Sequence, residues 1–327
     1  MQWIGKRLGL ILITGLLCVC PALRPASAAE FPEKEIRLIV PYKAGGQSDL
    51  FARKMAELAQ TKNLSPKPLL VVDIPGGNTA EGLRTVLNAT PDGYTLGVHH
   101  TSITTMKSLG QVPMSYKDFD LICQTLDMPF ALVVHADAPW NTASEFVEDV
   151  RRNPGKYSMA APGMGGGAHF AGLLFLSGQG ILDKVKHVPF DGGAEAATAV
   201  MARRVDIRPA SFGDAARFVR SGQQKLLVLL YDKKLPGFEE TPIASDIGLK
   251  DYFVQRQAIF APKNTPAAVK QKLASMFKAI VETPEFQEFT LQMGSQVHYM
   301  DEAEVTEIYS QDEKIINEFA KIITGQK

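Results

Sequence analysis

Short apolar runs alternate with amphipathic segments along the first third of the chain. The run at 36–41 suits a buried strand, and residues 49–60 then place apolar side chains on one helical face. Two further apolar runs, at 69–73 and 95–98, are separated by a helical pattern over 79–89. This alternation of strands and helices predicts a parallel sheet with helices on both faces.

The same alternation resumes after residue 129. Strands are predicted at 130–134, 156–160, 185–188 and 205–207, and helices at 143–152, 169–177 and 194–203. From residue 265 the pattern is mainly helical, over 267–282 and 302–323. We therefore expect an α/β protein of two domains, with residues 30–130 and 251–327 in domain 1 and residues 131–250 in domain 2.

The first 29 residues have the pattern of a secretory signal peptide. Lys6 and Arg7 precede an uncharged run from residue 8 to residue 20, and small residues follow. We expect cleavage near Ala28 or Ala29 and export to the periplasm. The apolar run is too short to span a bilayer comfortably, so no stable membrane insertion is expected.

Charge and cysteine content limit the partners and the covalent scaffold. The 35 Lys and Arg balance the 35 Asp and Glu, and loss of the leader removes three cations, so the mature chain is weakly acidic. Such a chain has no electrostatic footprint for nucleic acid. Only Cys123 lies beyond the leader, which excludes an intramolecular disulfide and predicts a buried, apolar role for that residue.

Glycine-rich segments follow several of the predicted strands. Ligands of open α/β sheets bind beyond the carboxyl ends of the strands, and glycines there let backbone N–H groups gather at a helix start, where they bind a carboxylate or phosphate. The candidate ligand-binding residues after the first three strands are Tyr42, Ala44, Gly45, Gly46, Ser48, Asp49, Gly76, Gly77, His100, Thr101 and Ser102. Those after the later strands are Pro162, Gly163, Gly165, Gly167, His169, Phe190 and Asp191.

Several of these residues also have purely structural interpretations. Asp49 would repel an anion and is suited to capping its loop, and Asp191 is suited to capping a turn. His169 stands at a helix start, where it could hydrogen-bond the loop. Only one of His99 and His100 is expected to face a cleft if both continue a strand, because successive side chains alternate between faces.

The motifs of nucleotide-binding and hydrolytic enzymes are missing from the chain. No Gly-Lys-Ser/Thr follows the glycines, and no Gly-x-Gly-x-x-Gly follows the first strand. Neither HExxH nor Gly-x-Ser-x-Gly occurs. We therefore expect no cofactor, no metal site and no catalysis.

The order of these motifs resembles that of a known receptor family. IRLIVPYKAGGQSDLFAR, IPGG, PDGYTL, NPGKYSMAAPGMGGGAH, HVPFDGGAEAATAVMARRVDI and FAPKNTP occur in the order and spacing of the periplasmic substrate-binding proteins of tripartite tricarboxylate transporters, the Bug receptors. The resemblance implies a type II-like periplasmic binding protein, in which each domain is a sheet flanked by helices and the cleft lies at the interface. It also implies capture of a small organic carboxylate and transient delivery to two integral-membrane subunits.

The resemblance also implies which loops hold the carboxylate. The first half of the site would come from the segment around Gly45 and Gly46, and the second half from the segment that ends at His169. This chain departs from the family just before the second glycine loop, where relatives commonly have serine or threonine and this chain has Ala161-Pro162. It also departs at Arg208 and at Arg256. Either arginine could pair with a second carboxylate, although arginines of this kind are more often solvated or part of a structural ion pair.

Ligand identity and physiological role stay open at this point. A di- or tricarboxylate, an aromatic carboxylate and an acidic amino acid all fit an anion site of this kind. The alternative to transport is a ligand-sensing module that reports carboxylate levels to a signalling receptor, and a secreted hydrolase is the less favoured third reading.

Overall fold

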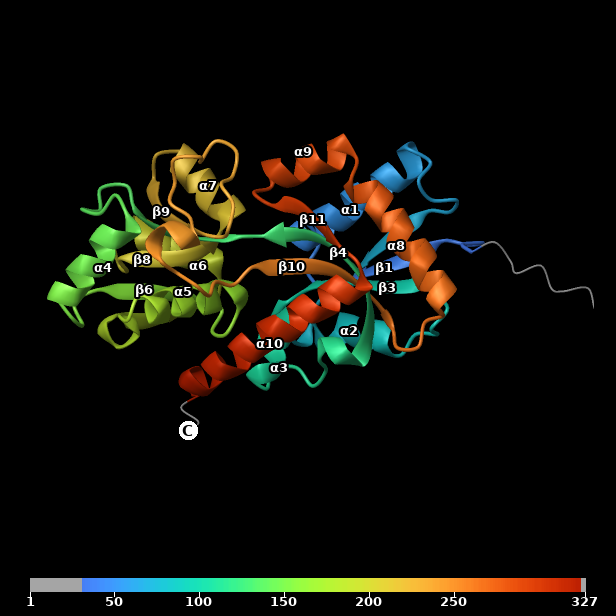
Figure 1. The fold of residues 1–327 in the computed structure, drawn as a ribbon, viewed down its shortest axis with the longest axis horizontal. Helices are drawn as coiled ribbons and strands as arrows, with labels where there is room; N and C mark the ends of the chain where they lie inside the picture. The colour runs from blue at the N-terminus through green and yellow to red at the C-terminus, as the bar shows by residue number, and fades with distance from the viewer. Residues whose placement is uncertain (1–30, 325–327) are drawn as a thin grey trace, which may run out of the picture. The chain divides into compact units, whose positions relative to one another are not determined.

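The computed structural model describes residues 31–324, and Figure 1 shows them as two sheets with helices packed against each. The expected leader and its cleavage positions lie outside the described residues. By their contacts, the described residues from Pro32 onward form a single compact body. No helix within the described residues is both long and apolar enough for a membrane span.

The first sheet has six strands in the order β11-β4-β10-β3-β1-β2. As predicted, β1 (Ile36–Val40) pairs in parallel with β2 (Leu69–Asp73) and with β3 (Thr95–His100). The other half of the sheet is antiparallel and was not evident from the alternation. It contains β4 (Phe119–Met128), β10 (Gln255–Pro262) and β11 (Gln296–Met300).

Helices cover both faces of this sheet, as the alternation predicts. Figure 1 shows α8 and α9 on one side and α2, α3 and α10 on the other. The α-helices are α1 (Gln47–Thr61), α2 (Ala80–Leu87), α3 (Ser102–Ser108), α8 (Ala267–Val281), α9 (Pro284–Gln292) and α10 (Glu302–Thr324), and the short 3-10 helices are η1 (Gly77–Thr79) and η2 (Tyr116–Asp118). Their apolar faces bury Ile39, Leu83, Phe260 and Tyr309 in one core.

The second sheet has five strands in the order β7-β6-β8-β5-β9. Its strands are β5 (Phe130–His135), β6 (Ser158–Pro162), β7 (Lys186–Phe190), β8 (Ile207–Ser211) and β9 (Gln224–Leu230). Its helices are α4 (Ala143–Arg152), α5 (Gly167–Gly178), α6 (Gly193–Met201) and α7 (Phe212–Arg220), with η3 (Leu182–Lys184) and η4 (Ala244–Ile247). Strands β6 and β8 begin two residues later than predicted and extend beyond the predicted ends. The extensions contain Pro162 and Pro209, and proline usually lies outside the interior of a strand.

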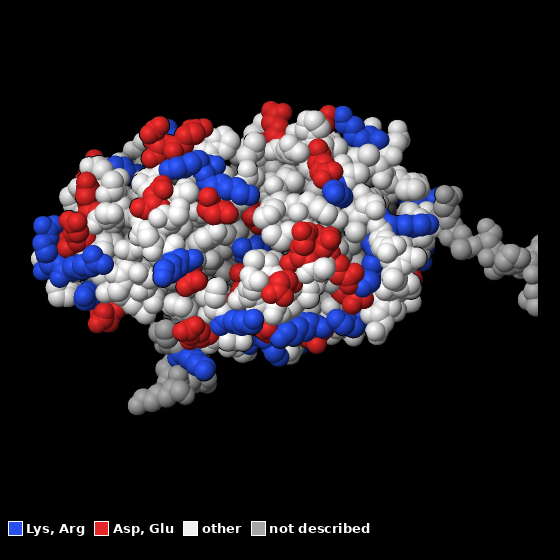
Figure 2. All heavy atoms as spheres, in the orientation of Figure 1, with Lys and Arg blue, Asp and Glu red and all other residues white. Residues whose placement is uncertain are grey.

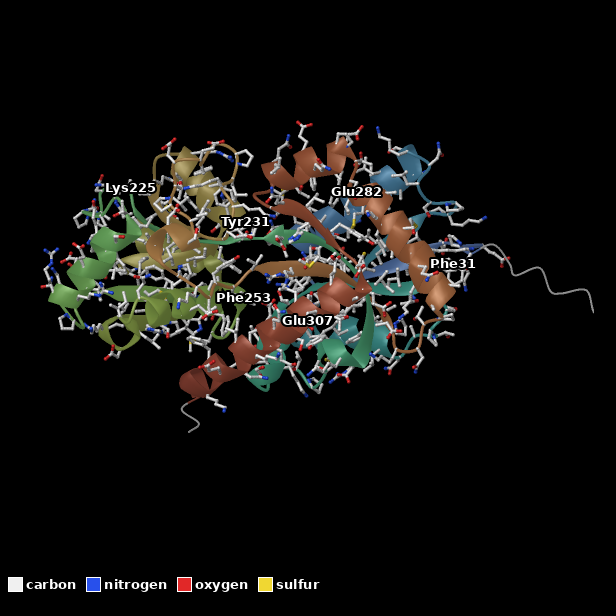
Figure 3. All side chains as sticks on the ribbon, in the orientation of Figure 1. Phe31, Lys225, Tyr231, Phe253, Glu282 and Glu307 are labelled. Atoms are coloured by element: carbon white, nitrogen blue, oxygen red, sulfur yellow. The ribbon has the colours of Figure 1, made fainter. Side chains whose placement is uncertain are left out.

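The chain passes between the two sheets at two places. Strand β4 leads into β5 with only Pro129 between them, and the chain returns through Phe253 just before β10. The rings of Phe130 and Phe253 stack at these crossings with centroids 6.0 Å apart. Figure 3 labels Phe253 in this region, together with Tyr231 after β9.

Helix α10 belongs to both cores. Tyr309, near its middle, is buried in the core of the first sheet, and Ile316, two turns later, is buried in the core of the second. Residue 316 falls within our expected domain 1, so the last turns of this helix pack across the expected boundary. The domain limits themselves stay a prediction.

Candidate functional site

We call each sheet with its helices a unit. The strand directions bring the loops of both units to the junction between the sheets. Strand β10 is antiparallel to both β3 and β4, so β1 and β3 run in the same sense as β4 and end where β4 passes into β5. Strand β8 is antiparallel to β5, and β6 and β7 run with β8. The carboxyl ends of β6, β7 and β8 therefore lie on the side from which β5 enters. Both sets of predicted loops thus meet at one junction.

Three helices that begin at this junction start with glycine caps. The N-caps of α1, α5 and α6 are Gly46, Gly166 and Gly192, and no side chain accepts a hydrogen bond from the first turn at any of them. In contrast, the hydroxyls of Thr142 and Thr283 cap α4 and α9. The first N–H groups of a helix need acceptors, and an anion supplies them when no side chain does. The junction therefore has the backbone chemistry of an anion site.

Asp49 holds the loop that precedes α1. Its Oδ2 accepts a hydrogen bond from the Gly45 N–H at 2.7 Å, and its Oδ1 lies 2.7 Å from Arg53 Nε. Burial acts to raise the pKa of Asp49, but the Gly45 N–H and Arg53 outweigh it and hold the pKa below its usual value. Gly45 has φ +78°, which only glycine adopts without strain. Asp49 thus caps the loop, as the structural interpretation expects, and its contact with a ligand stays a prediction.

Tyr42, His99 and His100 form an aromatic cluster beside this loop. The Tyr42 hydroxyl lies 3.1 Å from His99 Nε2, and the Tyr42 ring stacks on His100 with centroids 5.1 Å apart. The two histidine rings lie with centroids 5.0 Å apart, although alternation along a strand would separate them. Which of the two faces a cleft stays a prediction. Strand β3 ends at His100 and α3 begins at Ser102, so the chain turns before alternation can separate them.

Burial keeps both histidines neutral. It lowers the pKa of His99 to about 4, although a hydrogen bond to the His100 carbonyl opposes the shift. Burial and the neighbouring His99 lower the pKa of His100 as well. Ser102 Oγ lies 2.6 Å from His100 Nδ1. Neither ring is therefore a cation at neutral pH. His99 Nδ1 donates to the His100 carbonyl, so the neutral His99 ring has no second N–H for a ligand.

Thr101 ties the end of β3 to the second chain crossing. Its hydroxyl donates to the Val254 carbonyl at 3.1 Å and accepts from the Arg256 N–H at 2.9 Å. The side chain is fully buried, so its observed contacts are structural.

The loop between β6 and α5 is fastened internally. Gly163 N donates to the Phe190 carbonyl at 2.8 Å, and Gly165 N donates to His169 Nδ1 at 3.0 Å. Because Nδ1 accepts, the proton of His169 resides on Nε2, which is buried without a partner among the described residues. Burial and the nearby His187 lower the pKa of His169 to about 4. His169 therefore has the loop contact that its structural interpretation expects, and a free N–H donor besides.

The same loop lies against the first unit. Gln111 Nε2 donates to the Met164 carbonyl at 3.1 Å, and Leu109 occupies the space that a side chain at Gly165 would need. A Cβ at Gly167 would approach the rings at the two chain crossings to 2.9 and 3.1 Å. These glycines permit close packing between the units, so their ligand contacts stay a prediction beside that role.

The remaining loop residues are placed at the strand ends as expected. Gly76 and Gly77 follow β2 and lead into η1, where the carboxyl group of Glu81 fills the space beside Gly76. Phe190 ends β7, and the Asp191 N–H donates to Glu195 Oε2 at 3.1 Å. The ligand contacts of these residues stay a prediction.

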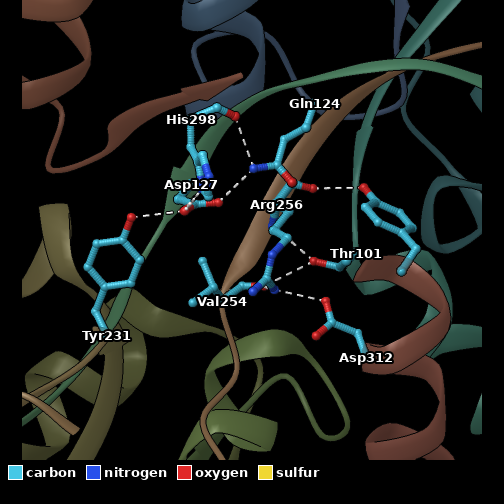
Figure 4. Close-up of polar contacts among 9 residues, drawn as sticks. Thr101, Gln124, Asp127, Tyr231, Val254, Arg256, His298 and Asp312 are labelled. Carbon is cyan, nitrogen blue, oxygen red and sulfur yellow. Dashed lines mark hydrogen bonds and ion pairs between the residues drawn. The ribbon is translucent and has the colours of Figure 1, made fainter. Parts of the chain in front are cut away.

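Each arginine proposed as a clamp has an internal carboxylate partner. Arg208 is 0% exposed, and its Nη1 lies 2.6 Å from Asp214 Oδ2 while Gln224 accepts from its other nitrogens. Burial lowers the pKa of Arg208 against the opposing effect of Asp214. Figure 4 shows Arg256 paired with Asp312 at 2.8 Å. Both guanidinium groups therefore already have protein partners. Their possible role as ligand clamps stays a prediction.

A second polar cluster fixes the chain crossings. Asp127 at the end of β4 accepts from Gln124 Nε2 at 2.9 Å and from the Tyr231 hydroxyl at 2.9 Å, and His298 Nδ1 lies 2.7 Å from it (Figure 4). The cluster joins β4, β11 and the end of β9. Over residues 31–324, no group of three or more His, Cys, Asp or Glu side chains could hold a metal ion.

An open groove between the units contains residues that the sequence analysis missed. Its volume is about 860 Å³, and its lining residues are Gly45, Gln47, Ser211, Gly213, Asp214, Arg217, Arg220, Ser221, Gln292 and Met293. The predicted strand at 205–207 hid the fact that Ser211 stands at the carboxyl end of β8. The start of a helical pattern directly after Ser211 was the available signal. Figure 2 shows acidic and basic side chains interspersed on the drawn face, so attraction for an anion depends on local groups.

Comparisons with known proteins agree with this architecture. The model of the tripartite tricarboxylate transporter family receptor matches residues 51–324. A UPF0065 protein of Bordetella pertussis is 32% identical over 276 residues, which cover 82% of this chain and 83% of that protein. A solved TctC solute-binding protein from Polaromonas is 26% identical with TM-score 0.78, covering 91% of this chain and 100% of that one. The periplasmic binding protein BugD is 26% identical with TM-score 0.72, covering 90% and 99%.

Proposed function

This chain belongs to the tripartite tricarboxylate transporter receptor family, and we propose that it captures a small organic carboxylate at the junction of its two sheets. The glycine-capped starts of α1, α5 and α6 carry the proposal, because they present helix N-termini without side-chain caps from both units. The neutral His169 in the first turn of α5 adds an N–H donor without a fixed charge. A carboxylate would exchange its hydration for these preoriented groups.

Capture would be followed by closure and delivery. The two crossings, at Pro129 and near Phe253, are short connections that can absorb a small rotation between the sheets. Ligand would shift the population from open to closed forms, and the closed form would be recognised by two integral-membrane transporter subunits. The family match favours this transport role over the alternative of a sensing module.

A thermal shift series tests carboxylate capture directly. The full chain is expressed with its own N-terminus, purified and heated with a panel of mono-, di- and tricarboxylates, with neutral sugars and amides as controls. A true ligand stabilises the native state by about 2.7 kcal/mol at a hundredfold excess over its dissociation constant. Stabilisation by carboxylates alone supports the proposal. A folded, ligand-free protein that responds to no carboxylate overturns it.

A cap substitution locates the binding to the α1 loop. Gly46→Val places a branched side chain at a position where even a Cβ lies 3.1 Å from the Lys43 carbonyl oxygen, so it blocks close backbone approach. Thr142→Val is the matched control, because it removes the hydroxyl cap of α4 away from the junction. Each change should lower stability by about 1 kcal/mol. Only Gly46→Val should abolish the carboxylate response, and equal responses from both variants would contradict this location.

Export and the absence of turnover are proposed with the same function. Intact mass spectrometry of protein from a periplasmic fraction should show cleavage near Ala28 or Ala29. Uncleaved protein confined to the cytoplasm would contradict the export proposal. A bound carboxylate should be recovered chemically unchanged by NMR after long incubation, whereas a new product would indicate an enzyme.

A further inference from the structure

The groove beside the α1 loop is larger than one carboxylate group requires. Its volume of about 860 Å³ lies near the upper end of the range for small-molecule sites, about 300–1,000 Å³. Gly45 and Gln47 line it from the first unit, and residues of α7 line it from the second. A ligand whose first carboxylate occupies the start of α1 can therefore extend toward α7.

Two arginines of α7 line the far side of this groove. Arg217 and Arg220 are three residues apart, so they are neighbours on the helix surface. The Arg217 side chain is 70% exposed, which leaves its guanidinium accessible to a ligand. Both guanidinium groups rest on aromatic rings, Arg217 at 4.7 Å from the Phe218 centroid and Arg220 at 5.3 Å from the Phe238 centroid. Stacking of this kind restricts the side chains before any ligand binds.

A partly buried carboxylate supports the first of these arginines. Asp214 Oδ1 accepts from Arg217 Nη2 at 3.0 Å, and Asp214 Oδ2 accepts from Arg208 Nη1 at 2.6 Å. Asp214 supplies the single carboxylate among the groove's lining residues and is shared by these two arginines, while Arg220 has no carboxylate partner among the described residues. Two guanidinium groups thus share one carboxylate, Arg220 adds a further cation, and the α7 side of the groove keeps a net positive charge.

We propose that Arg217 and Arg220 form a second anion subsite, which selects a ligand with two carboxylate groups. This inference rests on the proposed function, because the first carboxylate is the one held at the glycine-capped start of α1. Arg208, the residue that the sequence suggested as a clamp, then acts as a positioning residue through Asp214. The second carboxylate is bound by exposed groups at the groove wall, not by the buried guanidinium.

Matched pairs of ligands test the subsite. Isothermal titration calorimetry compares hexanoate with adipate and benzoate with terephthalate, since each pair differs only in the second carboxylate. The double variant Arg217→Gln/Arg220→Gln is compared with Arg152→Gln, which removes an exposed arginine in the last turn of α4. The double variant should weaken the preferred dicarboxylate at least about tenfold, as expected for loss of charge-assisted hydrogen bonds. The matching monocarboxylate should change less than about twofold, and Arg152→Gln should change neither.

The outcomes separate this inference from the proposed function. Equal losses for the mono- and dicarboxylate, or unchanged dicarboxylate affinity with the melting temperature retained, would overturn the subsite while carboxylate capture stands. If the unaltered protein binds neither these four ligands nor any other carboxylate in the panel, both proposals are overturned. A selective loss of affinity for the dicarboxylate supports both the subsite and the proposed function. Arg208→Gln should reproduce a smaller form of that selective loss if Arg208 positions Arg217.

Discussion

The contact between Gly213 and the turn at Met293 leaves no room for a side chain. Gly213 lies in the first turn of α7, and a Cβ built on it would be 2.3 Å from the Met293 carbonyl oxygen. Ordinary van der Waals contact would need a separation larger by about 1 Å. The obstacle is backbone on both sides, so neither partner can rotate away. Gly213→Ala must therefore push α7 and this turn apart.

The expected cost follows from overpacking, less a gain in helix propensity. Forced insertion of a methyl group typically costs about 1–3 kcal/mol, while replacing a helical glycine by alanine returns up to about 1 kcal/mol. We expect a net loss of about 1–2 kcal/mol in the free energy of unfolding. The displaced Met293 carbonyl also accepts from Gln47 Nε2 at 3.1 Å. Because Gln47 is in the first turn of α1, carboxylate affinity should fall as well.

Urea unfolding and calorimetric titration measure the two effects. The matched control is Gly193→Ala, which also adds a methyl group to the first turn of a helix in the second unit, where nothing lies within 4 Å of the new Cβ. The control should be unchanged or slightly more stable. If Gly213→Ala is as stable as Gly193→Ala, the reasoning from the close backbone contact is refuted.

Three further predictions concern buried polar groups. Burial raises the pKa of Asp312 to about 6 although Arg256 opposes the shift, so the folded protein binds more protons than the unfolded chain between about pH 4 and pH 6. The free energy of unfolding should therefore fall as pH rises through that window, by about 3 kcal/mol relative to Asp312→Asn in paired urea titrations. Asp49→Ala leaves the Gly45 N–H without its acceptor and should cost about 2 kcal/mol in urea unfolding. Cys123 is buried and burial raises the pKa of its thiol, so a thiol reagent should label it only as the protein unfolds.

Each of these predictions has a result that would contradict it. Parallel pH profiles of the native protein and Asp312→Asn would show that this carboxyl has an ordinary pKa. An unchanged unfolding midpoint for Asp49→Ala would mean that the loop does not depend on its cap. Rapid labelling of Cys123 under native conditions would place the thiol near the surface.

Local sequence patterns were enough to predict those strands and helices whose signals lie within one short segment. The ranges of β2 and α4 agree with the predicted ones, since an apolar run and a Thr142-capped helical pattern are encoded within those segments. The glycine loops were also predictable, because each follows a strand directly. The antiparallel strands β4 and β10 were not, since they bury Gln124 and Gln257 and acquire their partners from distant segments.

Tertiary packing decided which groups are available to a ligand. The sequence alone identified Arg208 as a possible clamp, yet the fold buries it against Asp214 and Gln224 and leaves Arg217 at the groove. It likewise brought the rings of two adjacent histidines together where strand alternation would separate them. Backbone propensity acts over a few residues, whereas the partner of a charge depends on where segments far apart in the chain pack. For this reason the sequence located the glycine-rich loops, and only the folded chain showed which groups lie opposite them.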